Sequence, residues 1–520
     1  MLTHPEDPAR PTPVQAATST ARGRFPQWML PLLLSAALVG WQLGFDAKPR
    51  ELDRTYKMSA SLGMAADLPN LYFYFFHHFG LFPVGAMEVP ELGPSRQDAE
   101  AFVAEHGDRL RMDFGLPTNT PRFGDYGSLF VLLPDVLLRG DPVHPSAILF
   151  NEILFVAALL ALFWALWLEG YRLLAACIVV LVGSDPFQLF ETYARGNIFS
   201  LPISVALLAL ATHVRFLSGR KGVDRWAWAI AIGGGVLLAT FREIRSEAVF
   251  IGVSMIASYL LIRASPFRQR ALLALAFVAA FTLTGQLWNA YWTRSFDRAE
   301  QFVARAGGQV YAGPRGKHHA LWHSVLSGLG DHGGDRGFSW DDRVAFRWAT
   351  TFDPLTNPRP LAYHYTDGYY FEETYDGLHH VAPTDVPEYN ELARERVLSE
   401  IRLHPGWYAG ILGKRVIAIL RNATPASLAL GTGRVGIFPW AGWLLLPVLI
   451  AALVARKHFL AKLVLFTTPL SAVALMVYSG SGITYYGIAH LIAFAIALDA
   501  LVRAPAWRAL LPALSRPHGR

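Results

Sequence analysis

Positions 226–263 read WAWAIAIGGGVLLATFREIRSEAVFIGVSMIASYLLIR, a charged patch between two apolar runs. Each run, 226–241 and 248–263, is about long enough to cross the roughly 30 Å of membrane hydrocarbon at about 1.5 Å per helical residue. The patch contains four ionisable side chains: Arg242, Glu243, Arg245 and Glu247. Such groups are costly near lipid unless they face water, a partner or a ligand. The stretch therefore predicts a membrane hairpin with a polar feature at its tip.

The whole chain has the composition of a multi-span membrane protein. Of its 520 residues, 53% are hydrophobic and 17% are charged, and the mean hydropathy is +0.29. A soluble domain carries about 25% charged residues. Apolar runs recur along the sequence at 28–45, 147–168, 171–188, 198–214, 226–241, 248–263, 271–290, 435–455, 459–479 and 483–502. We therefore predict an α-helical polytopic membrane protein with about ten transmembrane helices, in the inner (plasma) membrane.

The basic residues that flank these runs predict the orientation. With the N-terminus inside, every inside segment is basic, whereas the outside loops near 189–197 and 480–483 hold one Arg between them. Both termini are therefore predicted to be cytoplasmic. The net charge of +6 follows from this asymmetry, so it indicates membrane topology and contact with membrane lipids rather than nucleic-acid binding.

The predicted spans divide the chain into five parts. These are a disordered cytoplasmic tail (1–27), a membrane domain of seven spans (28–292) that includes an outside loop (46–146), an extracytoplasmic domain (293–434), a membrane domain of three spans (435–502) and a cytoplasmic tail (503–520). Cys177 is the one cysteine, so the two large outside segments fold without an intramolecular disulfide.

The first outside segment opens with acids and continues with aromatic residues. Asp46, Glu51 and Asp53 follow directly on the first predicted span, which places them near the membrane surface. Positions 71–79, LYFYFFHHF, are too short to span, and their aromatic character predicts a helix lying in the membrane interface.

The second outside segment is rich in polar clusters between 318 and 380. Its glycine-rich loop at 328–337, GLGDHGGDRG, matches neither a phosphate loop nor a dinucleotide fingerprint. The His and Asp residues lack the regular spacing of a metal site, so we predict a structural or substrate-contact role, with no metal and no cofactor. Helical periodicity follows at 388–402.

An amphipathic stretch at 407–421 precedes the last spans and carries Lys414 and Arg415. It predicts a helix on the outer leaflet. Two interpretations remain open for its basic residues: they bind anionic lipid headgroups, or they help to hold a lipid phosphate.

This layout resembles the GT-C superfamily of membrane glycosyltransferases. The resemblance covers most of the chain in layout, and in motif it rests on the acids at 46–53 and the patch at 241–247. It implies that an acid in the first outside loop acts as catalytic base or positions the acceptor. It also implies that arginines at the outer membrane face hold the phosphate of a polyprenyl-phosphate sugar donor.

Carried onto this chain, the resemblance makes Asp53 the first candidate for the catalytic acid, followed by Glu51 and Asp46. The acids are spread out here, whereas the mannosyl- and aminoarabinosyl-transferase branches have an adjacent Asp-Glu pair. Arg242 and Arg245 become the candidate ligands of the donor phosphate, with Lys414 and Arg415 added from the amphipathic stretch.

The chemistry suits these residue types. A carboxylate deprotonates an acceptor hydroxyl, and arginine stabilises the charge that grows on the leaving phosphate, so the reaction demands no metal. The predicted function is sugar transfer to an extracytoplasmic acceptor of the cell envelope: a surface glycan, a lipid or a protein. A purely structural alternative for 241–247 is a self-neutralising hairpin tip, since its two acidic residues balance its two basic residues.

Two other functions remain open. One is a transporter or flippase of a lipid-linked glycan, and the other is a surface-polysaccharide polymerase or ligase. Transporters often show internal duplication and charges within their spans. This sequence shows no repeat between its halves and few ionisable groups within its spans, which favours an enzyme at the outer surface.

Overall fold

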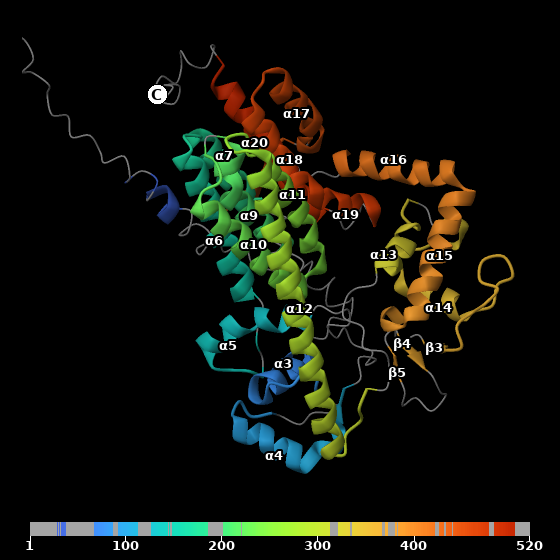
Figure 1. Ribbon diagram of the computed structural model, residues 1–520. Helices are drawn as coiled ribbons and strands as arrows, with labels where there is room; N and C mark the ends of the chain where they lie inside the picture. The colour runs from blue at the N-terminus through green and yellow to red at the C-terminus, as the bar shows by residue number, and fades with distance from the viewer. Residues whose placement is uncertain are drawn as a thin grey trace, which may run out of the picture. The chain divides into compact units, whose positions relative to one another are not determined.

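The computed structural model describes residues 29, 31, 33–37, 67–86, 92–112, 126–143, 145, 148–185, 201–219, 221–311, 321–332, 335–366, 370–372, 380–381, 383–421, 426–430, 433–438, 440–477 and 483–504 (Figure 1). The chain divides into two units, Met1–Gly44 and Phe45–Arg520. In the first unit, residues 33–37 are helical and lie within the predicted span at 28–45. All elements described below belong to the second unit.

The run predicted as a span at 435–455 begins in strand β7 (Gly433–Phe438), so its first part is wrong, and only its second part is helical. This second part and the other apolar runs predicted as spans lie on helices. These are α6 (Ile148–Leu168), α7 (Arg172–Gly183), α9 (Leu201–Leu217), α10 (Arg225–Ile244), α11 (Val249–Leu260), α12 (Phe267–Arg305), α17 (Leu445–Val454), α18 (His458–Thr467) with α19 (Ser471–Met476), and α20 (Ile483–Val502). Within the described residues, four stretches are long and apolar enough to cross a membrane: Leu149–Leu168, Arg225–Ile244, Phe267–Arg305 and His458–Met476. The chain is therefore a mostly helical membrane protein, and the number of ten spans stays a prediction.

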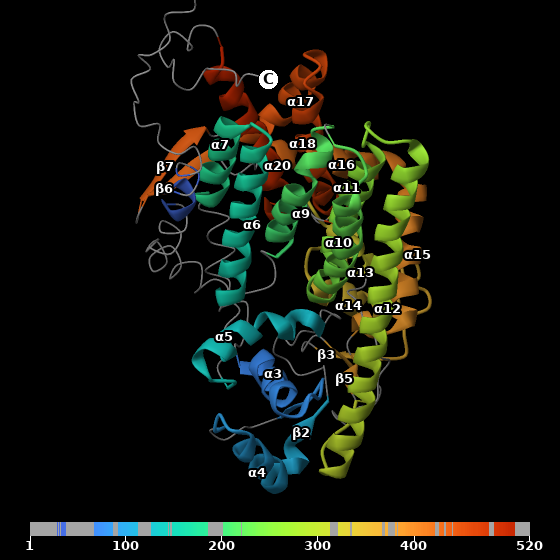
Figure 2. The ribbon, with the colours of Figure 1, turned by 60° about the vertical axis from the view of Figure 1, so that its left-hand side comes forward.

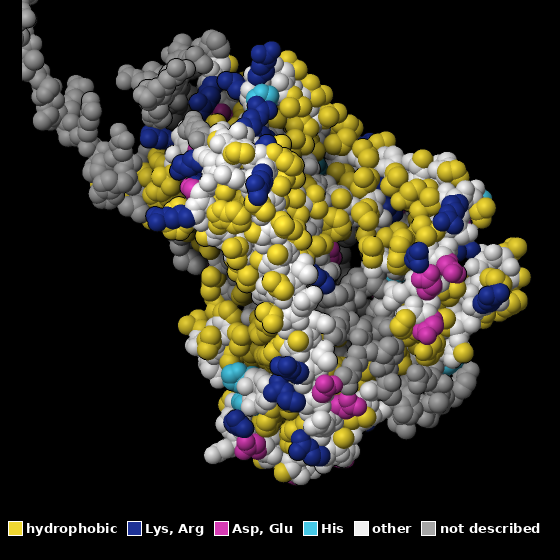
Figure 3. Space-filling model, viewed as in Figure 1, with side chains coloured by type: hydrophobic (Ala, Val, Ile, Leu, Met, Phe, Trp, Pro, Cys, Tyr) yellow, Lys and Arg dark blue, Asp and Glu magenta, His cyan; other side chains and the backbone are white. Residues whose placement is uncertain are grey.

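The apolar helices pack into a bundle that leaves a hydrophobic surface. α6 packs against α7 and α9, α10 against α12, and α20 against α7, α17 and α18. Large apolar side chains point outward, among them Ile232, Leu275 and Leu283, which are 48%, 61% and 61% exposed. Figure 3 shows hydrophobic side chains gathered over the upper part of the molecule, where α10 and the first part of α12 lie. A surface of this kind suits lipid rather than water.

Helix α12 is far longer than a membrane crossing requires. Its 39 residues extend over roughly 58 Å at about 1.5 Å per residue, against about 30 Å of hydrocarbon. The predicted span at 271–290 and the predicted domain boundary at 292/293 both fall inside this one helix. Figure 2 shows α12 running from beside α10 and α11 to the neighbourhood of β2.

The two segments predicted to lie outside keep the names first and second outside segment below, and their side of the membrane stays a prediction. The first outside segment folds around the second half of α12. Its elements are α3 (Asp67–Phe79), β1 (Gly85–Ala86), α4 (Arg96–His106), η1 (Gly107–Arg109), β2 (Leu110–Arg111), η2 (Tyr126–Val131) and α5 (Leu133–Arg139), with β1 and β2 antiparallel. The rings of Phe79 and Phe302 lie 5.3 Å apart. The backbone N–H of Phe82 donates to Ser295 Oγ at 3.1 Å. These contacts fix the segment to α12.

The prediction that 71–79 lies in the membrane interface is wrong. Tyr72, Phe73, Tyr74 and Phe75 are each at most 1% exposed, so protein rather than lipid covers them. The Phe75 ring lies 6.1 Å from the ring of Phe102 on α4. Burial, with a contribution from Asp98, raises the pKa of Tyr74 to about 12. The aromatic residues form the core of the first outside segment.

The second outside segment combines helices with a small sheet. Its elements are α13 (Leu321–Gly328), η5 (Asp335–Gly337), α14 (Asp342–Thr350), β3 (His364–Thr366), β4 (Tyr370–Glu372), β5 (His380–Val381), η6 (Pro383–Asp385), α15 (Pro387–Leu403), α16 (Pro405–Arg421), β6 (Ala426–Leu430) and β7 (Gly433–Phe438). Strands β3, β4 and β5 form one antiparallel sheet in that order, and β6 pairs with β7. Helix α15 matches the periodicity at 388–402.

One histidine of the predicted polar clusters has a structural role. His323 is 2% exposed, and its ring stacks 4.8 Å from that of Phe346. Its Nδ1 lies 2.6 Å from the Tyr389 hydroxyl, and its Nε2 lies 3.1 Å from Asp342 Oδ1. Burial raises the pKa of Tyr389 well above its ordinary value. His318 and His319 lie outside the described residues.

Candidate functional site

The charged patch at 241–247 forms the turn between α10 and α11. Helix α10 ends at Ile244, Arg245 follows in an extended conformation with φ −151° and ψ 111°, and η4 (Ser246–Ala248) leads into α11. The apolar run that drives α10 into the bundle stops at Phe241. The hairpin tip predicted from the sequence is therefore present, with its ionisable groups at the end of an apolar helix.

A cavity of about 270 Å³ opens beside this tip. It is lined by Tyr126, Arg242, Glu243, Phe281, Thr282, Gly285, Gln286, Asn289 and Trp292. These residues come from three elements: η2 of the first outside segment, the end of α10, and α12. The α12 residues recur at intervals of three and four, which places them on one face of the helix.

Arg242 is held at the cavity by α12. Its guanidinium carbon lies 5.8 Å from the centre of the Phe281 ring, within the range of a cation–π contact. The guanidinium also reaches Gly285, where a Cβ would lie 3.8 Å from Arg242 Nη1, an ordinary contact distance. The cation is thus presented on an aromatic face beside a wall that also carries Gln286 and Asn289.

The other charges of the tip are more enclosed. Glu243 is 4% exposed, and Gly127 of η2 packs directly on its backbone. Arg245 donates through Nη2 to Glu247 Oε1 at 2.6 Å, and the two side chains are only 12% and 17% exposed. Arg245 and Glu247 therefore neutralise each other, as the self-neutralising alternative expects for this pair, and Arg242 lines the cavity.

The structure places Lys414 and Arg415 elsewhere. Lys414 is exposed on α16 and lines a second cavity, of about 160 Å³, together with Asp331 and His332. Arg415 is fully buried, and its described contacts are with protein groups rather than solvent. A role for this pair at a lipid phosphate stays a prediction, but the contacts of Arg415 are those of a structural arginine.

The three candidate catalytic acids, Asp46, Glu51 and Asp53, lie outside the described residues. In the part of the chain that is described, no three His, Cys, Asp or Glu side chains come together as a metal site would require.

Sequence reasoning missed the lining residues of η2 and α12. A signal for α12 was present: Thr282, Gln286 and Asn289 are polar, spaced by four and three residues, and interrupt an otherwise apolar run. No comparable signal marks Tyr126, because its place in the cavity depends on how η2 packs against α10.

No known protein family and no curated protein matches the sequence. Among solved structures, the chain is similar to the archaeal oligosaccharyltransferase AglB from Archaeoglobus fulgidus, in complex with an inhibitory peptide and a dolichol-phosphate. The TM-score is 0.43 and the sequence identity is 11%. The alignment covers 95% of this chain and 52% of that one, so the chain spans about half the length of that structure.

Proposed function

We propose that the protein is an integral membrane glycosyltransferase that moves a sugar from a polyprenyl-phosphate donor to an extracytoplasmic acceptor. The observation that carries the proposal is the cavity at the hairpin tip, which Arg242 of α10 and Tyr126 of the first outside segment line together. The segment that bears the candidate acids therefore contributes to the same cavity as the candidate phosphate ligand.

The donor phosphate binds at Arg242 in this proposal. Arginine keeps its charge near lipid and grips phosphate with two parallel N–H groups. Phe281 holds the guanidinium in place, so little side-chain freedom is lost on binding. The outward apolar side chains of α10 and α12 offer a path for the polyprenyl chain, for example Leu283 and Leu287 at 61% and 72% exposure. Arg245, which pairs with Glu247, stays the second candidate ligand of the phosphate.

The transfer step needs a base from the first outside segment. We assign this role to Asp53, with Glu51 and Asp46 as the next candidates. The carboxylate takes the proton of an acceptor hydroxyl, whose oxygen attacks the anomeric carbon of the donor sugar. The bond between that carbon and the phosphate oxygen breaks, and the electron pair leaves with polyprenyl phosphate. Arg242 stabilises the charge that develops there.

The test uses purified protein in liposomes with a panel of polyprenyl-phosphate sugars. Arg242→Ala is expected to weaken donor binding by roughly ten- to a hundredfold, the equivalent of about 1.5–3 kcal/mol for a contact between charged groups. Asp53→Asn keeps the shape but removes the base, so turnover is expected to fall by about 10²-fold or more while donor binding is retained. Arg225→Ala, at the other end of α10, serves as the matched control.

The outcomes test the donor-binding role of Arg242 and the catalytic role of the acids separately. Normal donor binding by the Arg242→Ala, Arg245→Ala double variant would show that the tip is purely structural. Near-normal turnover in Asp53→Asn, with loss in Glu51→Gln or Asp46→Asn, would move the catalytic role to that residue. Unchanged turnover in all three acid variants would refute sugar transfer by this route.

A further inference from the structure

An open groove of about 640 Å³ lies along one face of α12, near the middle of the helix. Its described lining residues all belong to α12 and recur at intervals of three and four, which places them on one face: Leu287, Ala290, Tyr291, Arg294, Asp297 and Arg298. None of them lines the cavity at Arg242. The groove is therefore a separate candidate site on the same helix.

The part of α12 that precedes the groove has a surface suited to lipid. In the most apolar 18 residues of α12 only 17% are buried, against 39%, 39% and 50% in the other three stretches that are long enough to span. Leu287, at the start of the groove, is 72% exposed. Side chains this apolar and this exposed favour contact with hydrocarbon over contact with water. The groove thus begins at a surface that acyl chains can cover.

Along the groove the side chains change from apolar to aromatic to cationic. Leu287 is followed by Tyr291 about one turn later, and then by the exposed Arg294 and Arg298. Tyrosine is enriched where the hydrocarbon of a membrane meets its headgroups, and arginine favours the headgroup layer itself. Helix side chains lean towards the N-terminus, and Arg298 lies near enough to Tyr291 to interact with it electrostatically. The order of side chains matches hydrocarbon, interface and headgroup.

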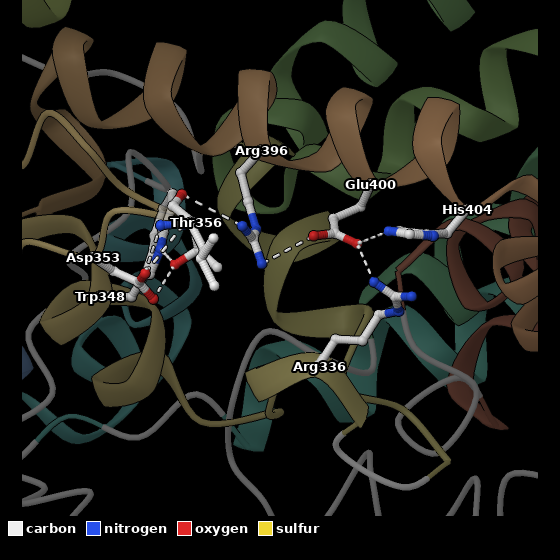
Figure 4. A network of polar contacts seen from close by, with 8 residues as sticks. Arg336, Trp348, Asp353, Thr356, Arg396, Glu400 and His404 are labelled. Carbon is white, nitrogen blue, oxygen red and sulfur yellow. Dashed lines mark hydrogen bonds and ion pairs between the residues drawn. The ribbon is translucent and has the colours of Figure 1, made fainter.

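The arginines of the groove differ from those of the second outside segment. There, Arg336 and Arg396 share the buried Glu400 carboxylate, at 3.4 Å and 3.0 Å (Figure 4). Within the described part of the chain, neither Arg294 nor Arg298 has an ion pair or a hydrogen bond. Their guanidinium groups are therefore available to an anion from outside the protein.

The lining of the groove also carries an excess of positive charge. Its two arginines stand against one carboxylate, that of Asp297, among the described lining residues. A guanidinium binds a phosphate through two parallel N–H groups. The volume of about 640 Å³ falls within the roughly 300–1,000 Å³ of ligand sites, so a phospholipid headgroup fits.

We infer that this face of α12 binds an anionic phospholipid of the surrounding membrane. The phosphate contacts Arg294 and Arg298, and the acyl chains cover the apolar part of the same face. A zwitterionic phospholipid would bring a cation of its own to the arginines, so the anionic class is preferred. The phosphate ligands distinguish this site from the donor site: Arg242 for the donor, and Arg294 with Arg298 for the phospholipid. The inference goes beyond the proposed function and does not depend on it.

The test measures lipid binding to the detergent-purified, full-length protein by native mass spectrometry. The probes are phosphatidylglycerol, phosphatidylcholine, a polyprenyl phosphate, and glycerophosphoglycerol, which is the headgroup of the first probe without its acyl chains. Wild type is expected to bind phosphatidylglycerol at least about fivefold more tightly than phosphatidylcholine, since each arginine near an anionic lipid contributes about that factor. Glycerophosphoglycerol is expected to bind far more weakly, because it cannot use the apolar part of the face.

Arg294→Gln and Arg298→Gln are each expected to weaken phosphatidylglycerol binding by about fivefold, and to leave phosphatidylcholine binding and the melting temperature unchanged. The double lysine variant, Arg294→Lys with Arg298→Lys, keeps the charge and is expected to retain most of the preference for the anionic lipid. Arg305→Gln is the matched control. Arg305 is exposed on the same face about 10 Å beyond Arg298, and its Nε donates to the Gln301 carbonyl at 3.0 Å, so its loss is expected to change neither lipid's binding.

Four results would overturn the inference. Wild type could bind the two phospholipids equally, or the Arg294→Gln, Arg298→Gln double variant could keep the preference. Arg305→Gln could weaken binding as much as Arg294→Gln does, which would indicate general surface charge. Glycerophosphoglycerol could bind as tightly as phosphatidylglycerol, or polyprenyl phosphate could bind more tightly and depend on this pair, which would assign the pair to a different ligand. Arg242→Ala is expected to leave phosphatidylglycerol binding unchanged, so the result is separate from the fate of the donor site.

Discussion

Lys414 and Arg415 are neighbours in the sequence with opposite surroundings. Successive residues of an α-helix point about 100° apart, so Lys414 faces out of α16 while Arg415 is 0% exposed. Arg415 donates to the backbone carbonyls of Gly328, Leu475 and Met476 and to the Asp331 carboxylate at 3.3 Å. Burial lowers the pKa of Arg415, and the nearby Asp331 opposes the shift. The side chain ties α16 to α13 and to the end of α19.

Arg415→Met is expected to destabilise the protein by about 3–5 kcal/mol, because it removes the guanidinium from the buried Asp331 carboxylate and the donors from three backbone carbonyls. The measurement is thermal melting of the detergent-purified protein. Lys414→Met, one residue away, is expected to change stability by less than about 0.5 kcal/mol. Equal, small effects of the two substitutions would contradict the structural role of Arg415.

The sequence could predict the helix that carries Lys414 and Arg415, but not which of the two side chains is buried. The apolar stripe at 407–421 and its basic residues are local features, and α16 follows them. The acceptors of Arg415 lie far away in the chain, near 328–331 and 475–476, and no local pattern announces them. Arg242 could be selected from the sequence, because a charged residue at the end of an apolar run stands out even when its contacts are unknown.

Between elements, a glycine sets the distance from η2 to α10. A Cβ on Gly127 would lie 2.9 Å from the carbonyl carbon of Glu243 and 3.1 Å from its Cβ, closer than side chains normally approach. Tyr126, the preceding residue, lines the cavity at the hairpin tip. The contact therefore controls how the first outside segment meets the candidate donor site.

Gly127→Ala is expected to force η2 away from α10, at a cost of about 1–3 kcal/mol for overpacking, and to weaken donor binding because Tyr126 moves with it. Thermal melting and the liposome binding assay measure the two effects. Gly233→Ala is the control, since a Cβ there meets nothing within 4 Å and alanine favours a helix. Donor binding equal to wild type in Gly127→Ala would mean that η2 does not shape the site.

Hydropathy predicted the helices of the bundle, but it did not predict whether lipid or protein surrounds each apolar segment. The runs at 147–168 and 226–241 correspond closely to α6 and α10. The aromatic residues at 71–79 are also apolar, yet protein covers them instead of lipid. The second half of α12 packs against part of this aromatic segment. The charged residues of α12 beyond 292 had predicted an outside segment rather than a continuation of the helix. A hydropathy scale reports only how strongly a side chain prefers to leave water. It cannot distinguish burial in lipid from burial in protein.

At the scale of the whole molecule, the orientation in the membrane is open to a direct measurement. The basic inside segments predict that position 335 is outside and position 221 is inside. In a Cys177→Ser background, a cysteine at 335 is expected to react with an impermeant maleimide on intact cells, and one at 221 only after permeabilisation. The reverse pattern would invert the topology, and labelling of both on intact cells would change the number of crossings.

Because α12 is one continuous helix, the number of residues within it determines how its two halves are oriented relative to each other. Its two halves form one unbroken helix, so one extra residue near position 290 would rotate everything beyond it by about 100°. Ser295 and Phe302 would then point away from Phe82 and Phe79, which they contact now. Seven extra residues would restore the direction to within about 20°, while lengthening the helix by about 10 Å. The bundle and the first outside segment can therefore stay in angular register only if insertions here come in near-whole turns.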